Sequence, residues 1–518
     1  TSGNSSSLSS KGNLTLSSGE TSLGGQLSAQ GDVSLNAAGL TTRAGSQLQG
    51  HNLTLSMQQG QLAGNQAASG DLQVTSAGNL SHSGTLNGQT VGVRSDQLDN
   101  SGSWQTEQLI LQLRGLTQQG SLLARQGMTL NADRLTNRGS IAATDLTLML
   151  NGAADNQNGG KIVARNGLTF NSASLNNSGT LSGDNVKLNS TVLDNNGLIQ
   201  GQQALDVQTT GLNNTGNGQL LSAGTMTFSG KQATNGGLWQ AQTLNLTADS
   251  LDNRGELNAG MQLLHLASAL NNQTGGRIVA QQGLTISAPT LTNDGTLSAP
   301  AVNLTADTLT NRGFLQGDNT LTLALRQVAN LSAGKVLTGG SLALAVPVLK
   351  NNGLLQVGGD LTLTGDSLDN SGDISARTLT LHYSGAQTHN AGAKLQAQLE
   401  AVLSAATLTN NGSVLADRLS LTSDTLGNGG QLQGTKQLDI TTTTAGNSGK
   451  LLTDGALTVK ASSLNNGGTL QGEAINLTGD SADNSGSLTA TTLLLHLAQQ
   501  FSNQPTGSLI AHQGLTLS

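Results

Sequence analysis

The sequence predicts an all-β protein that folds as a parallel β-helix (β-solenoid) of about 27 coils, with about 19 residues in each coil. Three observations predict this fold. A strand-turn-strand motif returns through most of the chain, a short strand with alternating aliphatic residues returns at the same spacing, and no window carries the apolar pattern of a helix. A period of about twenty residues is typical of a solenoid, in which each coil packs only on its neighbours.

The turn motif is clearest in residues 193–199, which read Leu-Asp-Asn-Asn-Gly-Leu-Ile. Asn and Gly tolerate the positive φ that a sharp corner demands, and the aliphatic residues on both sides can point into a core. Asn side chains stacked at one corner can also form hydrogen bonds along the axis. Similar motifs occupy residues 135–141, 175–181, 251–257, 368–374 and 464–470. The sequence therefore predicts a set of structural turn residues, of which the best examples are Asn137, Gly139, Asn177, Gly179, Asn195, Gly197, Asn253, Gly255, Asn370 and Gly372.

The second recurring element is a strand of the form aliphatic-x-aliphatic, which begins with residues 14–16 and continues to residues 515–517. Alternation places both aliphatic side chains on one face of such a strand. In one copy, Leu244 and Leu246 are therefore predicted to face the core and Asn245 to face outward. Gly interrupts every window and apolar residues do not recur at helical spacing, so no helix is expected.

A longer period of three coils repeats one leucine every 58 residues, at Leu135, Leu193, Leu251 and Leu309. The longest coil of a block carries an expanded turn, as in residues 271–278. Near the N-terminus the Asn turn is degraded, and His82 fills the Asn position of one turn there. We expect one continuous β-helix over residues 1–518, with degenerate turns in 1–97 and regular Asn-x-Gly turns in 98–518. Because the pattern starts and stops midway, we expect a piece of a longer chain.

The composition excludes several classes of protein. Aromatic residues make up 1% and charged residues 10% of the chain, so a thick globular core is not expected, and a thin column of Leu, Ile, Val and Ala takes its place. The formal net charge is −7 without runs of Lys or Arg, which argues against a nucleic-acid partner. No apolar stretch approaches the roughly 20 residues that span a bilayer. The absence of cysteine excludes disulfides and thiolate chemistry.

Together, the Leu-x-Asn-x-Gly-x-Leu turns and the Leu-Thr-Leu strands resemble the filamentous haemagglutinin repeats of bacterial two-partner-secretion exoproteins. That family includes large adhesins and contact-dependent growth inhibition effectors. The resemblance covers nearly the whole chain and is strongest from about residue 98 onward. It implies a right-handed β-helical filament, secreted to the outer surface of a bacterium by an outer-membrane transporter partner that acts through an N-terminal domain missing here.

In such proteins, distal modules contact a receptor on a host or neighbouring cell. The sequence has neither the Asn-Pro-Asn motif of the family's export domain nor the Val-Glu-Asn-Asn motif that precedes the toxin in many effectors. The chain therefore resembles the shaft without its two ends, and a monomeric rod is expected.

Candidate catalytic and metal-binding residues do not form a recognisable set. Four acidic residues share one turn position in different coils, where other coils have Thr, Asn or Lys, as expected of exposed turns: Asp194, Asp252, Asp369 and Asp483. His265 and His496 lie in strands without an acidic or His neighbour at ligand spacing, and calcium-binding Gly-Gly-x-Gly-x-Asp repeats are missing. We therefore predict no catalytic residue, no metal site and no cofactor.

Three functions are considered. The leading prediction is a structural shaft that presents distal receptor-binding or toxin modules for adhesion or growth inhibition. The first alternative is a carbohydrate-active β-helix enzyme, a polysaccharide lyase or hydrolase, in which Trp104, Trp239 and Phe314 beside turn glycines would stack on sugars, although packing against a neighbouring coil is favoured. The second alternative is a lattice or surface binder that uses a Thr ladder, which Gln112 and Lys187 interrupt.

Overall fold

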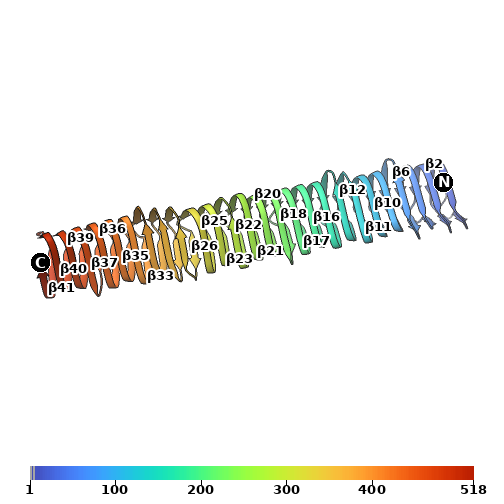
Figure 1. Cartoon of the computed structure of the whole chain (residues 1–518). Helices are drawn as coiled ribbons and strands as arrows, with labels where there is room; N and C mark the ends of the chain where they lie inside the picture. Colours follow the sequence, from blue (N-terminus) through green and yellow to red (C-terminus); the bar gives the residue numbers. More distant parts are fainter. Residues whose placement is uncertain (1–2, 4–5) are drawn as a thin grey trace. The chain divides into compact units, whose positions relative to one another are not determined.

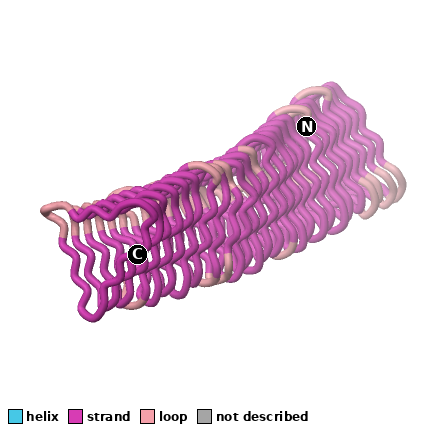
Figure 2. Tube along the Cα trace, turned by 60° about the vertical axis from the view of Figure 1, so that its left-hand side comes forward, coloured by secondary structure: helices cyan, strands magenta, loops and turns pink. Residues whose placement is uncertain are grey.

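The computed structural model describes residue 3 and residues 6–518, and in these residues it contains strands and no helix. The chain divides into two compact units, residues 1–260 and residues 261–518. Within each unit the strands lie side by side as consecutive coils (Figure 1), and strand covers most of each coil with short loops at the corners (Figure 2). The predicted parallel β-solenoid of about 27 turns, about 19 residues apart, is confirmed. One continuous domain over residues 1–518 remains a prediction.

The strands vary in length, with four residues in β13 and β32 and 17 residues in β16. Those of the first unit are β1 (Ser7–Ser10), β2 (Leu14–Leu23), β3 (Gln26–Ala29), β4 (Val33–Thr42), β5 (Gln47–Gly50), β6 (Leu53–Leu62), β7 (Asn65–Ala68), β8 (Leu72–Ser76), β9 (Asn79–His82), β10 (Thr85–Asn100), β11 (Ser103–Gln118), β12 (Ser121–Ala132), β13 (Arg134–Asn137), β14 (Ser140–Leu150), β15 (Ala153–Asn156), β16 (Lys161–Asn177), β17 (Thr180–Asn195), β18 (Leu198–Asn214), β19 (Gln219–Ser222), β20 (Thr225–Asn235) and β21 (Leu238–Asn253). The boundary falls within β22 (Glu256–Asn272).

The second unit repeats the same alternation of long and short strands. Its strands are β23 (Arg277–Ser287), β24 (Thr290–Asn293), β25 (Thr296–Asn311), β26 (Phe314–Asn330), β27 (Lys335–Thr338), β28 (Leu342–Ala345), β29 (Val348–Asn351), β30 (Leu354–Val357), β31 (Asp360–Gly365), β32 (Ser367–Asn370), β33 (Asp373–Tyr383), β34 (Ala386–His389), β35 (Lys394–Asn410), β36 (Ser413–Asn428), β37 (Gln431–Asn447), β38 (Lys450–Leu452), β39 (Ala456–Asn466), β40 (Thr469–Asn484), β41 (Ser487–Asn503) and β42 (Ser508–Leu517). A strand is short where an irregular corner interrupts the strand pairing of its coil.

Each coil consists of three extended segments joined by corners. In β17 the segments are residues 180–183, 185–190 and 192–195, and each pairs in parallel with the equivalent segment of β18. The pairing satisfies the backbone of one coil only when another coil lies on each side. Because ordering a coil costs about 1–2 kcal/mol per residue, the burial of a few aliphatic side chains cannot stabilise a coil alone, and the stack is the stable unit.

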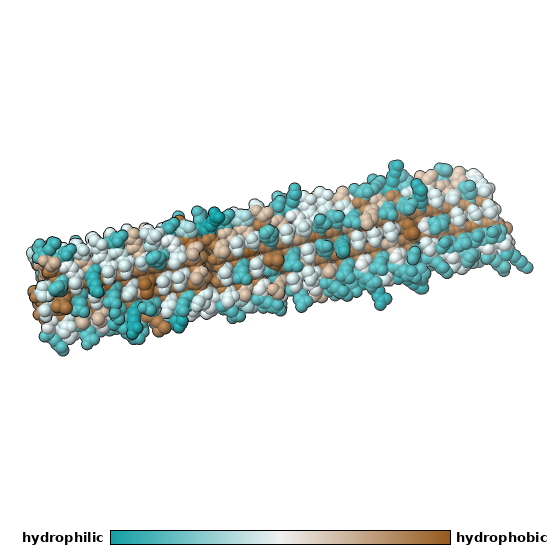
Figure 3. Space-filling view, viewed as in Figure 1, coloured by the Kyte–Doolittle hydropathy of each residue, from teal (hydrophilic) through white to brown (hydrophobic). Residues whose placement is uncertain are grey.

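The core is a column of aliphatic side chains on the inner face of the segments. Leu244 and Leu246 are each 1% exposed and Asn245 is partly exposed, which confirms the predicted strand phase. Trp104 and Trp239 are fully buried, so both pack in the core and do not stack on a surface sugar. Figure 3 shows one face of the coils, where apolar residues are visible in narrow lines and in small scattered patches between polar side chains.

Candidate functional site

The asparagines that the sequence marks as turn residues lie at strand ends and point into the stack. Asn137, Asn177, Asn195, Asn253 and Asn370 are all 0% exposed. In β17, for example, Asn195 accepts a hydrogen bond from Nδ2 of Asn177 at 2.8 Å and donates from its own Nδ2 to Oδ1 of Asn214 at 2.8 Å. The side chains therefore form a buried column in which every amide donates toward the C-terminus.

This asparagine column is long in both units. In the first unit it links seven asparagines in sequence order: Asn137, Asn156, Asn177, Asn195, Asn214, Asn235 and Asn253. In the second unit one run links Asn272 to Asn370 and another links Asn410 to Asn503. Each intramolecular hydrogen bond contributes about 0.5–1.5 kcal/mol, whereas a buried amide without partners costs about 1–3 kcal/mol. The column thus stabilises the stack only where it is unbroken.

The prediction that the turn asparagines and glycines adopt positive φ is wrong. Among the described residues, positive φ occurs only at Gly45, Gly159, Gly275 and Gly392, and not at the asparagines. Gly159 and Gly275 belong to expanded turns of the kind predicted for residues 271–278.

The short turns need glycine because the coils approach each other closely there. A Cβ on Gly197 would lie 2.2 Å from the carbonyl oxygen of Gly179 in the preceding coil. Gly139, Gly179, Gly255 and Gly372 would meet a carbonyl oxygen of the preceding coil at 2.1–2.2 Å in the same way. A side chain at these positions would therefore force neighbouring coils apart.

His82 replaces asparagine in the column of the first unit. It is 1% exposed and packs edge-on against Trp104, with ring centroids 5.2 Å apart. Trp104 Nε1 donates to Nδ1 of His82 at 2.8 Å, so Nε2 carries the proton and donates to Oε1 of Gln66 at 3.2 Å. Burial lowers the pKa of His82 to about 4, although the contact with Asn100 raises it. His82 is thus a neutral, buried residue at an asparagine position of the turn.

His389 interrupts the column of the second unit. Gln387 Nε2 donates to Nε2 of His389 at 3.0 Å, which leaves the proton on Nδ1, and Nδ1 has no partner. Oε1 of Gln387 and Oδ1 of Asn410 are also buried without a partner. Burial lowers the pKa of His389 to about 3. This cluster is the main polar defect of the second unit.

The candidate catalytic residues are not brought together. Asp194, Asp369 and Asp483 are exposed, and each accepts a hydrogen bond from an amide side chain of a later coil, while Asp252 is partly exposed. No group of three or more His, Cys, Asp or Glu side chains that could hold a metal ion occurs in residue 3 and residues 6–518. In the same residues, no helix is long and apolar enough to cross a membrane.

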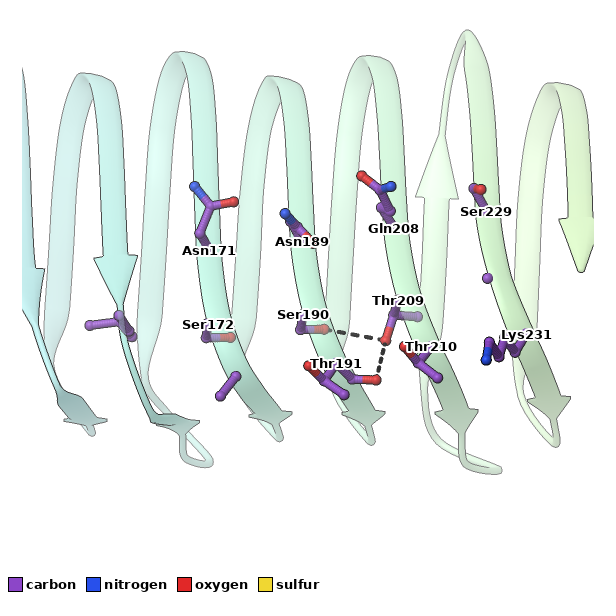
Figure 4. Close-up of a pocket in the computed structure, with 13 residues that line it drawn as sticks. Asn171, Ser172, Asn189, Ser190, Thr191, Gln208, Thr209, Thr210, Ser229 and Lys231 are labelled. Atoms are coloured by element: carbon purple, nitrogen blue, oxygen red, sulfur yellow. Dashed lines mark hydrogen bonds between the residues drawn. The ribbon is translucent and has the colours of Figure 1, made fainter.

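The first unit carries a surface groove that the sequence analysis missed. Two hollows of about 550 and 810 Å³ adjoin at β14, where Leu150 lines one and Met149 lines the other, and together they extend from β8 to β20. Part of its lining is shown in Figure 4. Its signal in the sequence is weak, because the lining residues share only a position in the coil and a polar character, as Asn171, Asn189 and Gln208 do.

The fold defines a parallel β-solenoid, and comparison with known proteins identifies its family. The haemagglutinin repeat family matches residues 1–84, 67–115, 111–158, 141–197, 180–255, 252–335, 301–382, 374–433 and 419–504. The chain therefore belongs to the haemagglutinin repeat family, and the resemblance found in the sequence is confirmed. No solved structure matches the chain.

Its curated relatives are much longer proteins. The chain is 35% identical over 452 residues to Toxin CdiA of Escherichia coli, covering 83% of this chain and 14% of the relative. It is 34% identical over 442 residues to tRNA nuclease CdiA of E. coli O6:K15:H31 (strain 536 / UPEC), covering 83% and 13%. It is 34% identical over 534 residues to tRNA nuclease CdiA of E. coli (strain STEC_O31), covering 98% and 16%. The chain thus spans about one seventh of the length of these relatives.

Proposed function

We propose that this chain is the elongated shaft of a secreted bacterial surface filament, which presents distal receptor-binding or toxin modules for adhesion or contact-dependent growth inhibition. The observation that carries the proposal is the regular stack of coils in each unit, bound by parallel pairing and by the asparagine column, in a chain of the haemagglutinin repeat family. In such a shaft the turn residues act structurally: asparagine bonds the coils together, and glycine allows their close approach.

The same proposal assigns the partners and the location. An outer-membrane transporter exports the parent protein to the bacterial surface, and a receptor on a neighbouring or host cell meets its distal modules. The names of the relatives refer to toxins and nucleases, but the matched region is only 13–16% of the three proteins described above. We therefore assign any nuclease or other catalytic activity to other parts of a parent protein, and a spacing role to this region.

A deletion of one three-coil block tests the spacing role. Leu193 stands in register with Leu251 three coils later, by way of Leu212 and Ala233. Deleting residues 194–251 from the parent protein joins Leu193 to Asp252 and recreates the turn sequence. The shaft should fold, become shorter by about 14 Å, and keep its activity toward neighbouring cells apart from a modest loss of reach.

A matched deletion in the second unit provides the control. Leu309 stands in register with Leu368 three coils later, so deleting residues 310–368 joins Leu309 to Asp369. Surface export, filament length in electron micrographs and inhibition of neighbouring cells are measured for both. If both proteins reach the surface with shortened filaments but only one loses activity outright, a local site and not a spacer explains the function.

A further inference from the structure

The groove of the first unit carries a row of polar side chains, of which three are unpaired and the fourth, Asn171, donates from Nδ2 to Sδ of Met149 at 2.8 Å. Asn171, Asn189, Gln208 and Ser229 stand in register on consecutive coils and form what we call the amide row. Figure 4 shows them along one edge of the groove, one on each coil. Asn189, Gln208 and Ser229 are exposed, and their side chains form no hydrogen bond within the described part of the chain. The row therefore presents amide and hydroxyl groups at the coil spacing of about 4.8 Å.

The floor and the opposite edge are hydroxyl-bearing and almost uncharged. Ser190 and Thr209 form the floor, where Ser190 Oγ donates to Thr209 Oγ1 at 3.4 Å and Thr209 Oγ1 donates to the carbonyl oxygen of Thr191 at 3.1 Å. Thr191 and Thr210 are exposed on the opposite edge. Lys231 at one end is the only charged residue that lines this half of the groove. The other half of the groove, between β8 and β14, carries charged residues, such as Arg114, which forms an ion pair with Asp96 at 3.1 Å.

These features exclude several ligands. An extended peptide would bind through its backbone, but the backbone of β17 is already paired on both sides, with β16 and β18. A nucleic acid needs several cations to neutralise its phosphates, and this half offers Lys231 alone. A lipid needs apolar lining, whereas Leu150 is the only large apolar side chain here and is 5% exposed. The site suits a neutral polymer that carries many hydroxyl groups.

We propose that this half of the groove binds a linear, neutral glycan in an extended conformation, with its axis parallel to the coil stack. Each amide offers two donors and one acceptor, which match neighbouring sugar hydroxyls. The sugar repeat of an extended β-1,4-linked chain is close to the coil spacing, so successive sugars can meet successive members of the amide row. An α-1,4-linked chain coils and loses this match. No carboxylate lines this half, so the proposal is binding and not cleavage.

The test uses the whole 518-residue chain and cellohexaose as the probe, with cellotriose and maltohexaose as comparison ligands, in calorimetric titrations. Cellohexaose should bind at least about tenfold more tightly than cellotriose, because a longer chain engages more coils, and more tightly than maltohexaose. Asn189→Leu combined with Gln208→Leu should weaken cellohexaose binding at least about tenfold.

The matched control places the same substitutions outside the groove on the same two strands. Asn185 of β17 and Gln203 of β18 are exposed and do not line the groove, so Asn185→Leu with Gln203→Leu should leave binding within about twofold. Circular dichroism checks that both pairs fold. The proposal is overturned if cellohexaose does not bind the unmodified chain, if maltohexaose binds equally, or if both pairs weaken binding alike. The shaft proposal would survive each of these results, because its deletion experiment measures export and reach.

Discussion

Repairing the polar defect of the second unit should stabilise it. Gln387 occupies the register position of Leu368 and Leu408, and His389 occupies that of Asn370 and Asn410. The double variant Gln387→Leu with His389→Asn therefore restores the motif of the neighbouring coils. Asn at position 389 can accept from Asn370 and donate to Asn410, as asparagines do elsewhere in the column.

The magnitude follows from the buried atoms that now lack partners. Three such atoms, Gln387 Oε1, His389 Nδ1 and Asn410 Oδ1, are removed or paired by the double variant. Each unpaired atom costs about 1–3 kcal/mol. The smaller amide leaves a small cavity in place of the imidazole, and this cavity cancels part of the stabilisation. We expect a net stabilisation of about 3 kcal/mol, which slows hydrogen exchange by local opening roughly a hundredfold.

Hydrogen exchange of backbone amides in β34 and β35, followed by mass spectrometry, measures this effect where it arises. The control makes the same kind of change on the surface of β33 and β35, by His382→Asn with Gln396→Leu, and both of these residues are exposed. Exchange in the control should match that of the unmodified chain. Unchanged or faster exchange in the repaired variant, with native circular dichroism, would refute the energetic role given to the column.

Two further predictions concern pH and the turn glycines. Because burial lowers the pKa of His389 from 6.5 to about 3, the unfolded chain binds a proton below about pH 6.5 that the folded unit does not. The urea midpoint of unfolding should therefore fall progressively as the pH is lowered from about 6.5 to 3. The Gln387→Leu, His389→Asn variant should lack the part of this fall that comes from His389. Gly197→Ala should destabilise the first unit by roughly 1–3 kcal/mol, because the added Cβ clashes with the preceding coil. The control Gly211→Ala has no atom within 4 Å of the added Cβ and should change stability by less than about 0.5 kcal/mol. Equal urea midpoints for the two variants would contradict the close-approach argument.

The repeat made the architecture predictable from sequence. A single Leu-Asn-Leu segment at residues 244–246 is ambiguous between strand and helix, but its many copies at one spacing fix the period and therefore the inward phase of Leu244 and Leu246. The buried bonding of Asn195 rests on the same logic, because a polar residue repeated at one position of a stack meets its own copies.

What escaped prediction depends on distances between coils. The sequence of a turn does not reveal whether glycine is needed for positive φ or for space, and the 2.2 Å approach at Gly197 decides for space. The groove escaped because Asn189 and Gln208 are ordinary exposed strand residues in sequence, and only the register between coils aligns them. The unpaired atoms around His389 were not predicted, because in the sequence a histidine at an asparagine position reads as a harmless substitution in a turn.

The two interruptions of the column also show which coil a substitution damages. One interruption is Gln118, which occupies the asparagine position in the coil before Asn137. Its Nε2 donates to the carbonyl oxygen of Ser140 at 3.2 Å, while Oδ1 of Asn137 has no partner. At the break after Asn370, Nδ2 of Asn370 still donates to the carbonyl oxygen of Gly372 at 3.1 Å, while Oδ1 of Asn410 has none. Intact members of the column also donate to such backbone carbonyls, as Asn177 does to Leu198 and Asn195 does to Gly197. The donor before each break therefore keeps an acceptor, whereas the oxygen after each break has lost its only side-chain donor. Since every amide donates toward the C-terminus, a substitution in the column should weaken the coil that follows it more than the coil that precedes it.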